Sequence, residues 1–230
     1  MKIYRNLYGD EDTPPNIPVG YEKVFEDAKK DIKTIAKDIR DDEIKYLPPA
    51  SKVFNAFHMT PFDAVRVVII GEGPYFKPGL ANGLAFSCDN GVPPSLLNIY
   101  KEIKNCYPDF VIPKHGDLSP WCSQGVLLLN ISLTVKSGQA TYGKDLLWMS
   151  FIDTVITSLI NRKDKKKIIF VMWGQKAQKL TKLISGKAIE LKAAHPSPTN
   201  TRGGFLGTKQ FSKINKYLRK QEEPEIDWTL

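Results

Sequence analysis

Short apolar runs alternate with longer amphipathic stretches along the chain, and this alternation predicts strands separated by helices. Four runs are apolar at almost every position, which is typical of strands buried on both faces of a parallel sheet. They cover Val67–Ile70, Gly125–Asn130, Ile168–Gly174 and Ile189–Ala194. We therefore predict an α/β fold with a central four-stranded, mainly parallel sheet and helices on both of its faces.

Apolar residues at helical spacing occupy most of the intervals between these strands. The predicted helices cover residues 21–45, 51–57, 95–103, 145–162, 175–184 and 209–219. Ser51 and Ser95 are predicted to cap their helices, because a serine hydroxyl accepts a hydrogen bond from a free N–H of the first turn. Residues 116–121 are predicted to form a turn.

The length of 230 residues favours a single domain. Residues 1–20 end in the proline-rich stretch Thr13–Gly20 and are predicted to be an irregular arm, which leaves residues 21–230 for the domain. The 33 Lys and Arg against 25 Asp and Glu give a net charge of +8. This excess suits a polyanionic partner such as DNA, although it also promotes solubility.

The three cysteines, Cys88, Cys106 and Cys122, are widely spaced. Their spacing matches neither a disulfide framework nor a zinc site, so we predict a reducing compartment, cytoplasmic or nuclear. The polar N-terminus is unlike a signal peptide. No apolar run approaches the roughly 18 residues of a membrane-spanning helix. We expect no metal and no other cofactor.

Polar residues stand just after the predicted strands, where parallel sheets bind their ligands. Residues 71–76 follow the first strand, Asn130 and Gly174 end the second and third, and His195 follows the fourth. Asn130 offers a donor and an acceptor, which suits the edge of a base or an amide. A lone asparagine after a strand is more often a turn residue, and a lone histidine is usually a satisfied polar group.

Two aromatic residues, Tyr75 and Phe86, belong to the glycine-rich loop after the first strand. They could be ordinary core residues. Taken together with the amide and the imidazole, they predict a pocket for a flat heterocycle rather than for a phosphate.

Several motifs in order resemble the uracil-DNA glycosylases of the first, uracil-specific family, from about residue 21 onward. The matching segments are Gly71-Glu-Gly-Pro-Tyr-Phe76, Gly83-Leu-Ala-Phe-Ser87, Pro93-Pro-Ser95, Gly125-Val-Leu-Leu-Leu-Asn130, Trp173-Gly174 with Ala177-Gln178, and His195-Pro-Ser-Pro198. The resemblance implies a protein that kinks DNA and flips a uracil out of the duplex into a pocket.

In that picture Phe86 stacks on the base, Asn130 reads its Watson–Crick edge and Tyr75 excludes a thymine methyl. His195 hydrogen-bonds a uracil oxygen as negative charge builds on the leaving base. Glu72 and Phe76 are also expected to line the pocket. The residues expected to contact DNA are Pro93, Ser95, Gly174, Ser197, Thr199, Asn200 and Arg202.

The chain departs from the family pattern at the positions that perform the reaction. The catalytic aspartate falls on Gly73, the neighbouring histidine on Phe76 and the glutamine on Glu72. The leucine that enters the base stack falls on Thr199, and an arginine of the same loop is shifted to Arg202. These departures predict a homologue that keeps its uracil pocket while excision is disabled or very weak.

Such a protein is expected to act as a monomer by binding DNA, free uracil or a protein that targets active glycosylases. One alternative is an active or slow uracil-DNA glycosylase of base excision repair, in which Glu72 replaces the missing aspartate. Another is an accessory factor, or a decoy for a DNA-mimicking glycosylase inhibitor.

Overall fold

The computed structural model of the chain describes residues 17–139, 145–163, 166–200 and 203–230. Its central sheet contains β2 (Val67–Gly71), β3 (Val126–Asn130), β5 (Ile169–Trp173) and β6 (Ile189–Ala193). The strand order is β3-β2-β5-β6, and all three neighbouring pairs are parallel. The predicted four-stranded sheet is confirmed, with each strand within one residue of its expected bounds.

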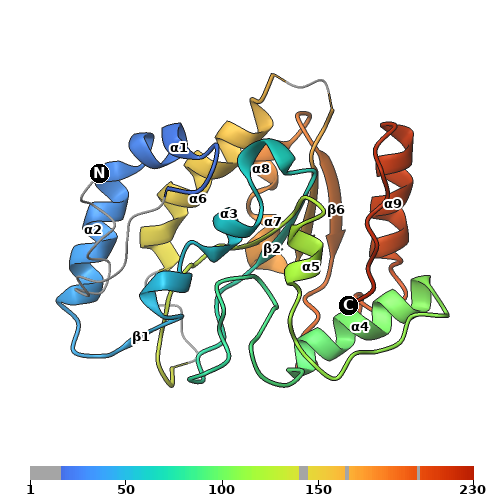
Figure 1. Cartoon of the computed structure of the whole chain (residues 1–230), viewed down its shortest axis with the longest axis horizontal. Helices are drawn as coiled ribbons and strands as arrows, with labels where there is room; N and C mark the ends of the chain where they lie inside the picture. Colours follow the sequence, from blue (N-terminus) through green and yellow to red (C-terminus); the bar gives the residue numbers. More distant parts are fainter. Residues whose placement is uncertain (1–16, 140–144, 164–165, 201–202) are drawn as a thin grey trace.

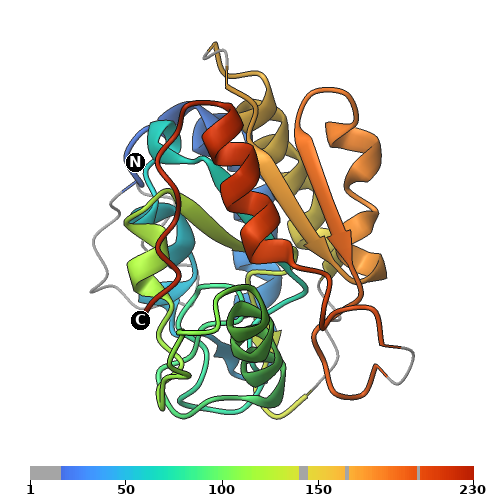
Figure 2. The same cartoon turned by 90° about the vertical axis from the view of Figure 1, so that its right-hand side faces the viewer.

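Helices cover both faces of this sheet (Figures 1 and 2). One layer contains α1 (Glu22–Asp27), α2 (Lys29–Arg40) and α6 (Asp145–Ile160), and both α1 and α2 pack on α6. On the opposite side, α4 (Pro94–Cys106) packs on α9 (Gln210–Lys220). Every residue of β2, β3 and β5 is buried because both faces are covered, whereas the edge strand β6 is partly exposed.

Two long predicted helices are divided in the structure. The stretch 21–45 forms α1 and α2, which meet at Ala28, a residue whose φ of −90° and ψ of 7° leave the helical region. The stretch 175–184 forms α7 (Gln175–Gln178) and α8 (Thr181–Ile184). Apolar periodicity continues through such bends, so the sequence pattern alone did not reveal them.

Both predicted serine caps were wrong. Ser51 lies inside the 3₁₀ turn η2 (Ala50–Lys52), and the helix after it, α3 (Asn55–Met59), begins after Phe54. Ser95 lies in the first turn of α4, whose N-cap is Pro93. The helix begins at Pro94 because proline lacks an N–H and has a φ already suited to the first helical position.

Several short elements were not predicted. The antiparallel pair β1 (Tyr46–Leu47) and β4 (Val135–Lys136) lies outside the central sheet, and η3 (Phe62–Ala64) precedes β2. The predicted turn at 116–121 runs into the short helix α5 (Ser119–Cys122).

The three cysteines are unpaired, and most of the predicted arm, residues 1–16, lies outside the described residues. Within the described ranges, no helix is both long and apolar enough to cross a membrane.

Candidate functional site

The carboxyl edge of the sheet gathers the residues that follow its four strands. Asn130 ends β3 opposite Gly71 of β2, while Trp173 of β5 is paired with Ala193 of β6. A Cβ placed on Gly174 would lie only 3.1 Å from the Cβ of His195. The structure thus brings together Asn130, the loop after β2, Gly174 and His195, as the parallel order of the strands predicts.

Asn130 is a buried amide with an unsatisfied acceptor. The residue is 3% exposed, and its Oδ1 has no hydrogen-bond partner among the described residues. Gly71 permits this arrangement, because a Cβ at that position would collide with Oδ1 of Asn130 and lie 2.9 Å from the Cβ of Ala85. An unpaired buried acceptor costs about 1–3 kcal/mol. Such a group suits a ligand that brings its own N–H donor.

Phe86 supplies an aromatic surface beside this amide. Its φ is +64°, an unusual conformation for a bulky residue and one that concentrates at functional sites. The hydroxyl of Tyr75 donates a 2.9 Å hydrogen bond to the carbonyl of Phe86. The centroid of the Phe86 ring lies 5.4 Å from the ring centroid of Trp173 and 6.0 Å from that of His195. The half-buried ring is therefore held between the ends of β2, β5 and β6.

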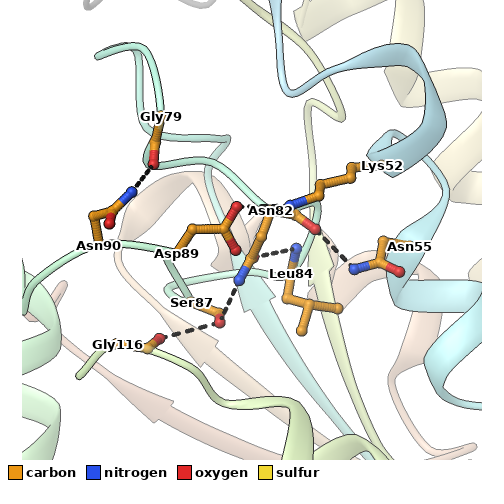
Figure 3. A network of polar contacts seen from close by, with 9 residues as sticks. All are labelled: Lys52, Asn55, Gly79, Asn82, Leu84, Ser87, Asp89, Asn90 and Gly116. Carbon is orange, nitrogen blue, oxygen red and sulfur yellow. Dashed lines mark hydrogen bonds and ion pairs between the residues drawn. The ribbon is translucent and has the colours of Figure 1, made fainter.

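A polar network fixes the loop that carries Phe86 (Figure 3). The hydroxyl of Ser87 accepts hydrogen bonds from Nδ2 of Asn82 at 2.9 Å and from the N–H of Leu118 at 3.1 Å, and it donates to the carbonyl of Gly116 at 3.1 Å. Nδ2 of Asn55 donates to the carbonyl of Asn82 at 2.8 Å. Buried bonds of this kind hold Phe86 in a conformation that its own backbone preference opposes.

The hydrogen bonding of His195 selects one neutral form of its ring. The N–H of Ser197 donates to Nδ1 of His195 at 3.0 Å, so a neutral imidazole carries its proton on Nε2. Burial lowers the pKa of His195 below its ordinary value of 6.5; the nearby carboxylate of Glu72 raises it, and the ammonium of Lys176 lowers it. At neutral pH the ring therefore offers an Nε2–H donor.

The loop after β2 has no carboxylate at position 73. Gly73 carries no side chain. The side chain of Glu72 is 27% exposed, and its Oε2 lies 3.3 Å from Nζ of Lys176. Glu72 is thus held toward α7 as half of an ion pair. Phe76 is partly buried, and its carbonyl accepts a hydrogen bond from the N–H of Gly138.

Several residues expected to contact DNA line a hollow of about 590 Å³ next to His195. Gly174, Thr199 and Asn200 are part of its wall. The hydroxyls of Ser197 and Thr199 are hydrogen-bonded at 2.7 Å, and Nδ2 of Asn200 donates to the carbonyl of His195 at 3.3 Å. These bonds order the loop at the mouth of the site.

The other DNA candidates are distributed around this hollow. Pro93 and Ser95 are at the start of α4 and do not line it, but Nδ2 of Asn98 in that helix donates to the carbonyl of Pro196 at 2.8 Å. The start of α4 and the loop after β6 are therefore joined directly. Arg202 lies outside the described residues.

One residue of the site, Lys176, was not predicted from the sequence. It pairs with Glu72 and lies between the matched segments Trp173-Gly174 and Ala177-Gln178. Its position just after a buried strand was the available signal. Trp173, which belongs to a matched segment, packs on Phe86. Among the described residues, no group of three His, Cys, Asp or Glu side chains is placed to hold a metal ion.

Comparison with protein families matches residues 57–219 to the model described as "Uracil DNA glycosylase superfamily". The chain is 41% identical to the uracil-DNA glycosylase of Actinobacillus succinogenes, over 100% of this chain and 99% of that protein. It is 46% identical to an Escherichia coli uracil-DNA glycosylase, over 86% of both chains.

Solved structures give the same result for the fold. The crystal structure of mimivirus uracil-DNA glycosylase superimposes with a TM-score of 0.82 over 91% of this chain and 86% of that chain, at 24% identity. A single-residue variant of mimivirus UNG in complex with UGI superimposes with the same TM-score at 26% identity, over 91% of this chain and 88% of that chain.

Proposed function

Because this chain belongs to the uracil DNA glycosylase superfamily, we propose that it recognises uracil in DNA, the recognition step of base excision repair. The observation that carries this proposal is the buried, unpartnered Oδ1 of Asn130. Uracil presents an N3–H donor between two carbonyl oxygens, whereas cytosine presents a bare N3 acceptor there. An amide held with its oxygen free therefore favours uracil over cytosine.

The remaining pocket residues fit the same base. Phe86 offers a partly exposed ring for stacking. The Nε2–H of neutral His195 suits a carbonyl oxygen of uracil, and it would stabilise negative charge on that oxygen. Tyr75 is bonded to the carbonyl of Phe86, so its ring is held beside the stacking surface, where a thymine methyl would compete with it.

We further propose that excision of the base is slow or absent. Cleavage of the glycosidic bond develops positive charge on the sugar, and a carboxylate next to it both orients water and offsets that charge. Gly73 supplies no such group. Loss of a general base alone lowers a rate by about 10²- to 10⁴-fold. The protein would then bind uracil, abasic sites or single-stranded DNA without efficient turnover.

An active glycosylase is the second candidate. Curated relatives at 41–49% identity are uracil-DNA glycosylases by name, and such identity over most of the chain favours a shared reaction. Glu72 is the one carboxylate of the loop Gly71–Phe76. Its ion pair with Lys176 holds it toward α7. To act on water at the sugar, Glu72 would have to leave this partner.

Binding of a glycosylase-targeting protein is a third candidate, favoured by the likeness to a mimivirus UNG variant that was solved in complex with UGI. A chain that presents the same surface without excising uracil would serve as a decoy. Co-purification with such an inhibitor, measured against DNA competitor, tests this role separately.

The deciding experiment measures binding and excision with the same DNA. Wild-type protein is mixed in excess with a labelled single strand that contains one uracil, and with a matched strand that contains thymine. We expect tighter binding to the uracil strand and single-turnover excision close to background. Robust excision would show that the protein is an active glycosylase. Equal binding of the uracil and thymine strands would refute the proposed recognition of uracil.

A further inference from the structure

We propose that Lys176 is a positioning residue, which pairs with Glu72 so that His195 stays neutral and keeps the loop of residues 195–200 in one conformation. The structural part of this inference concerns the protein alone. Its consequence for base binding rests on the proposed function. Glu72 stands where the resemblance places a glutamine, and Lys176 lies between the matched segments Trp173-Gly174 and Ala177-Gln178.

Three neighbouring parallel strands place the three residues at the same edge of the sheet. Glu72 follows β2, Lys176 lies in α7 just after β5, and His195 follows β6, and these strands are neighbours in the order β2-β5-β6. Nζ of Lys176 lies 3.3 Å from Oε2 of Glu72. The positive charge of Lys176 therefore opposes the negative charge of Glu72, and the two groups shift the pKa of His195 in opposite directions.

Neutrality matters because Nδ1 of His195 is used as an acceptor. The N–H of Ser197 donates to it, and the Ser197 hydroxyl in turn accepts a hydrogen bond from the N–H of Thr199 at 3.3 Å. Protonation of His195 would place a second N–H at Nδ1, opposite the N–H of Ser197. Two donors cannot share that bond, so the loop would have to rearrange.

Among the residues that the structure describes, two charged groups shift the pKa of His195 in addition to its lowering by burial: Glu72 after β2 raises it, and Lys176 in α7 lowers it. The ring also lies near the aromatic ring of Phe86 and the backbone at Gly174. Removal of Lys176 leaves an uncompensated carboxylate, which favours the imidazolium form.

The direction of the pH dependence follows from linkage. The pKa of His195 is lower in the folded protein than its ordinary value of 6.5. Between these two values the unfolded chain binds more protons than the folded one, so stability rises with pH in that window. The contribution of neutral His195 is therefore complete above about pH 6.5 and is lost as the pH falls toward the folded-state value.

The test is an NMR titration of the histidine rings in the full chain, with His58 and His115 as internal references. Lys176→Met should raise the pKa of His195, Glu72→Gln should lower it, and the double variant should return it close to the wild-type value. The matched control is Lys179→Met, a lysine only three residues further along that does not contribute to the pKa of His195. It should leave the titration unchanged.

Equal His195 titrations in Lys176→Met and Lys179→Met would overturn the proposal. A rise in Lys176→Met that persists in the double variant would also overturn it, because the lysine would then act without Glu72. Binding of free uracil is measured on the same samples between pH 5 and 8, and its loss in acid should begin at higher pH in Lys176→Met. Absence of uracil binding at every pH would refute the proposed function, while the ring titrations would still decide the role of Lys176.

Discussion

The part of the site proposed to face the base and the part proposed to perform the reaction differ in how strongly the fold depends on them. Asn130 is the last residue of a buried strand, and Ser87 fixes the loop of Phe86 through three buried hydrogen bonds. Gly73 has no side chain to contribute, and Thr199 is exposed. We therefore expect substitutions at Asn130 or Ser87 to disturb packing, and substitutions at Gly73 or Thr199 to change the reaction or DNA binding with little effect on packing.

Such a difference would allow the proposed loss of excision while the pocket stays intact. Selection for a stable fold retains residues whose loss would leave buried polar groups without a hydrogen-bond partner. Residues that contact only the substrate are retained only by selection for the reaction. The following experiments measure how sharply the two sides are separated.

The largest effect is expected from restoring the carboxylate. Gly73→Asp should raise the single-turnover rate of uracil excision by about 10²- to 10⁴-fold, because a general base returns to the site. Adding Phe76→His should raise it further. Gly73→Asn is the control, since it has the same shape without the charge. Equal rates for the Asp and Asn variants, or fast excision by the unmodified protein, would show that the missing carboxylate at position 73 does not limit excision.

The next largest effect is expected on the base-facing side. Asn130→Ala should weaken binding of free uracil by about 1–3 kcal/mol, because the polar edge of the base loses its partner. Isothermal titration calorimetry with uracil and thymine measures this loss and the preference for uracil. Asn161→Ala, at an exposed asparagine after α6, should leave both affinities unchanged. A pocket without preference for uracil over thymine would contradict retention of base recognition.

The hydrogen bonds of Ser87, which fix the loop of Phe86, are expected to contribute a similar amount to the free energy of unfolding. Ser87→Ala should lower the free energy of unfolding by about 1–3 kcal/mol, because Asn82, Gly116 and Leu118 lose a buried partner. Urea denaturation monitors this change. In the control Ser123→Ala, the removed hydroxyl donates an exposed hydrogen bond to the carbonyl of Pro120. Similar midpoints for both variants would show that the pocket does not depend on this network.

The smallest effect is expected at the tip of the loop after β6. Thr199→Leu should strengthen binding to duplex DNA with a uracil or an abasic site by less than about 1.5–3 kcal/mol, the gain from burying a leucine completely. Binding to single strands should change less, since no base has to leave a stack. Thr199→Val is the control, because it also lacks the hydroxyl but is too short to enter the stack. Fluorescence anisotropy at fixed salt distinguishes the three proteins.

Much of the architecture could be predicted because its signals are local. Each central strand is a run of apolar residues, and both faces of such a run must be covered, so parallel order and helical layers follow. The gathering of Asn130, Gly174 and His195 follows in turn, because parallel strands end at one edge. Helix boundaries were less accessible, since Pro94 and the bend at Ala28 depend on backbone conformation rather than on apolar spacing.

The sequence by itself determined the fold class, the four strands and the absence of a carboxylate at position 73, because these are properties of residue type and order. Only the tertiary structure decided that Glu72 is paired with Lys176 and that Asn130 keeps a free acceptor. It also decided that Ser197 donates to His195 and so selects its neutral form. No spacing rule contains the geometry of these contacts. The first two depend on how neighbouring strands of the sheet lie next to one another, and the third on the backbone turn after β6.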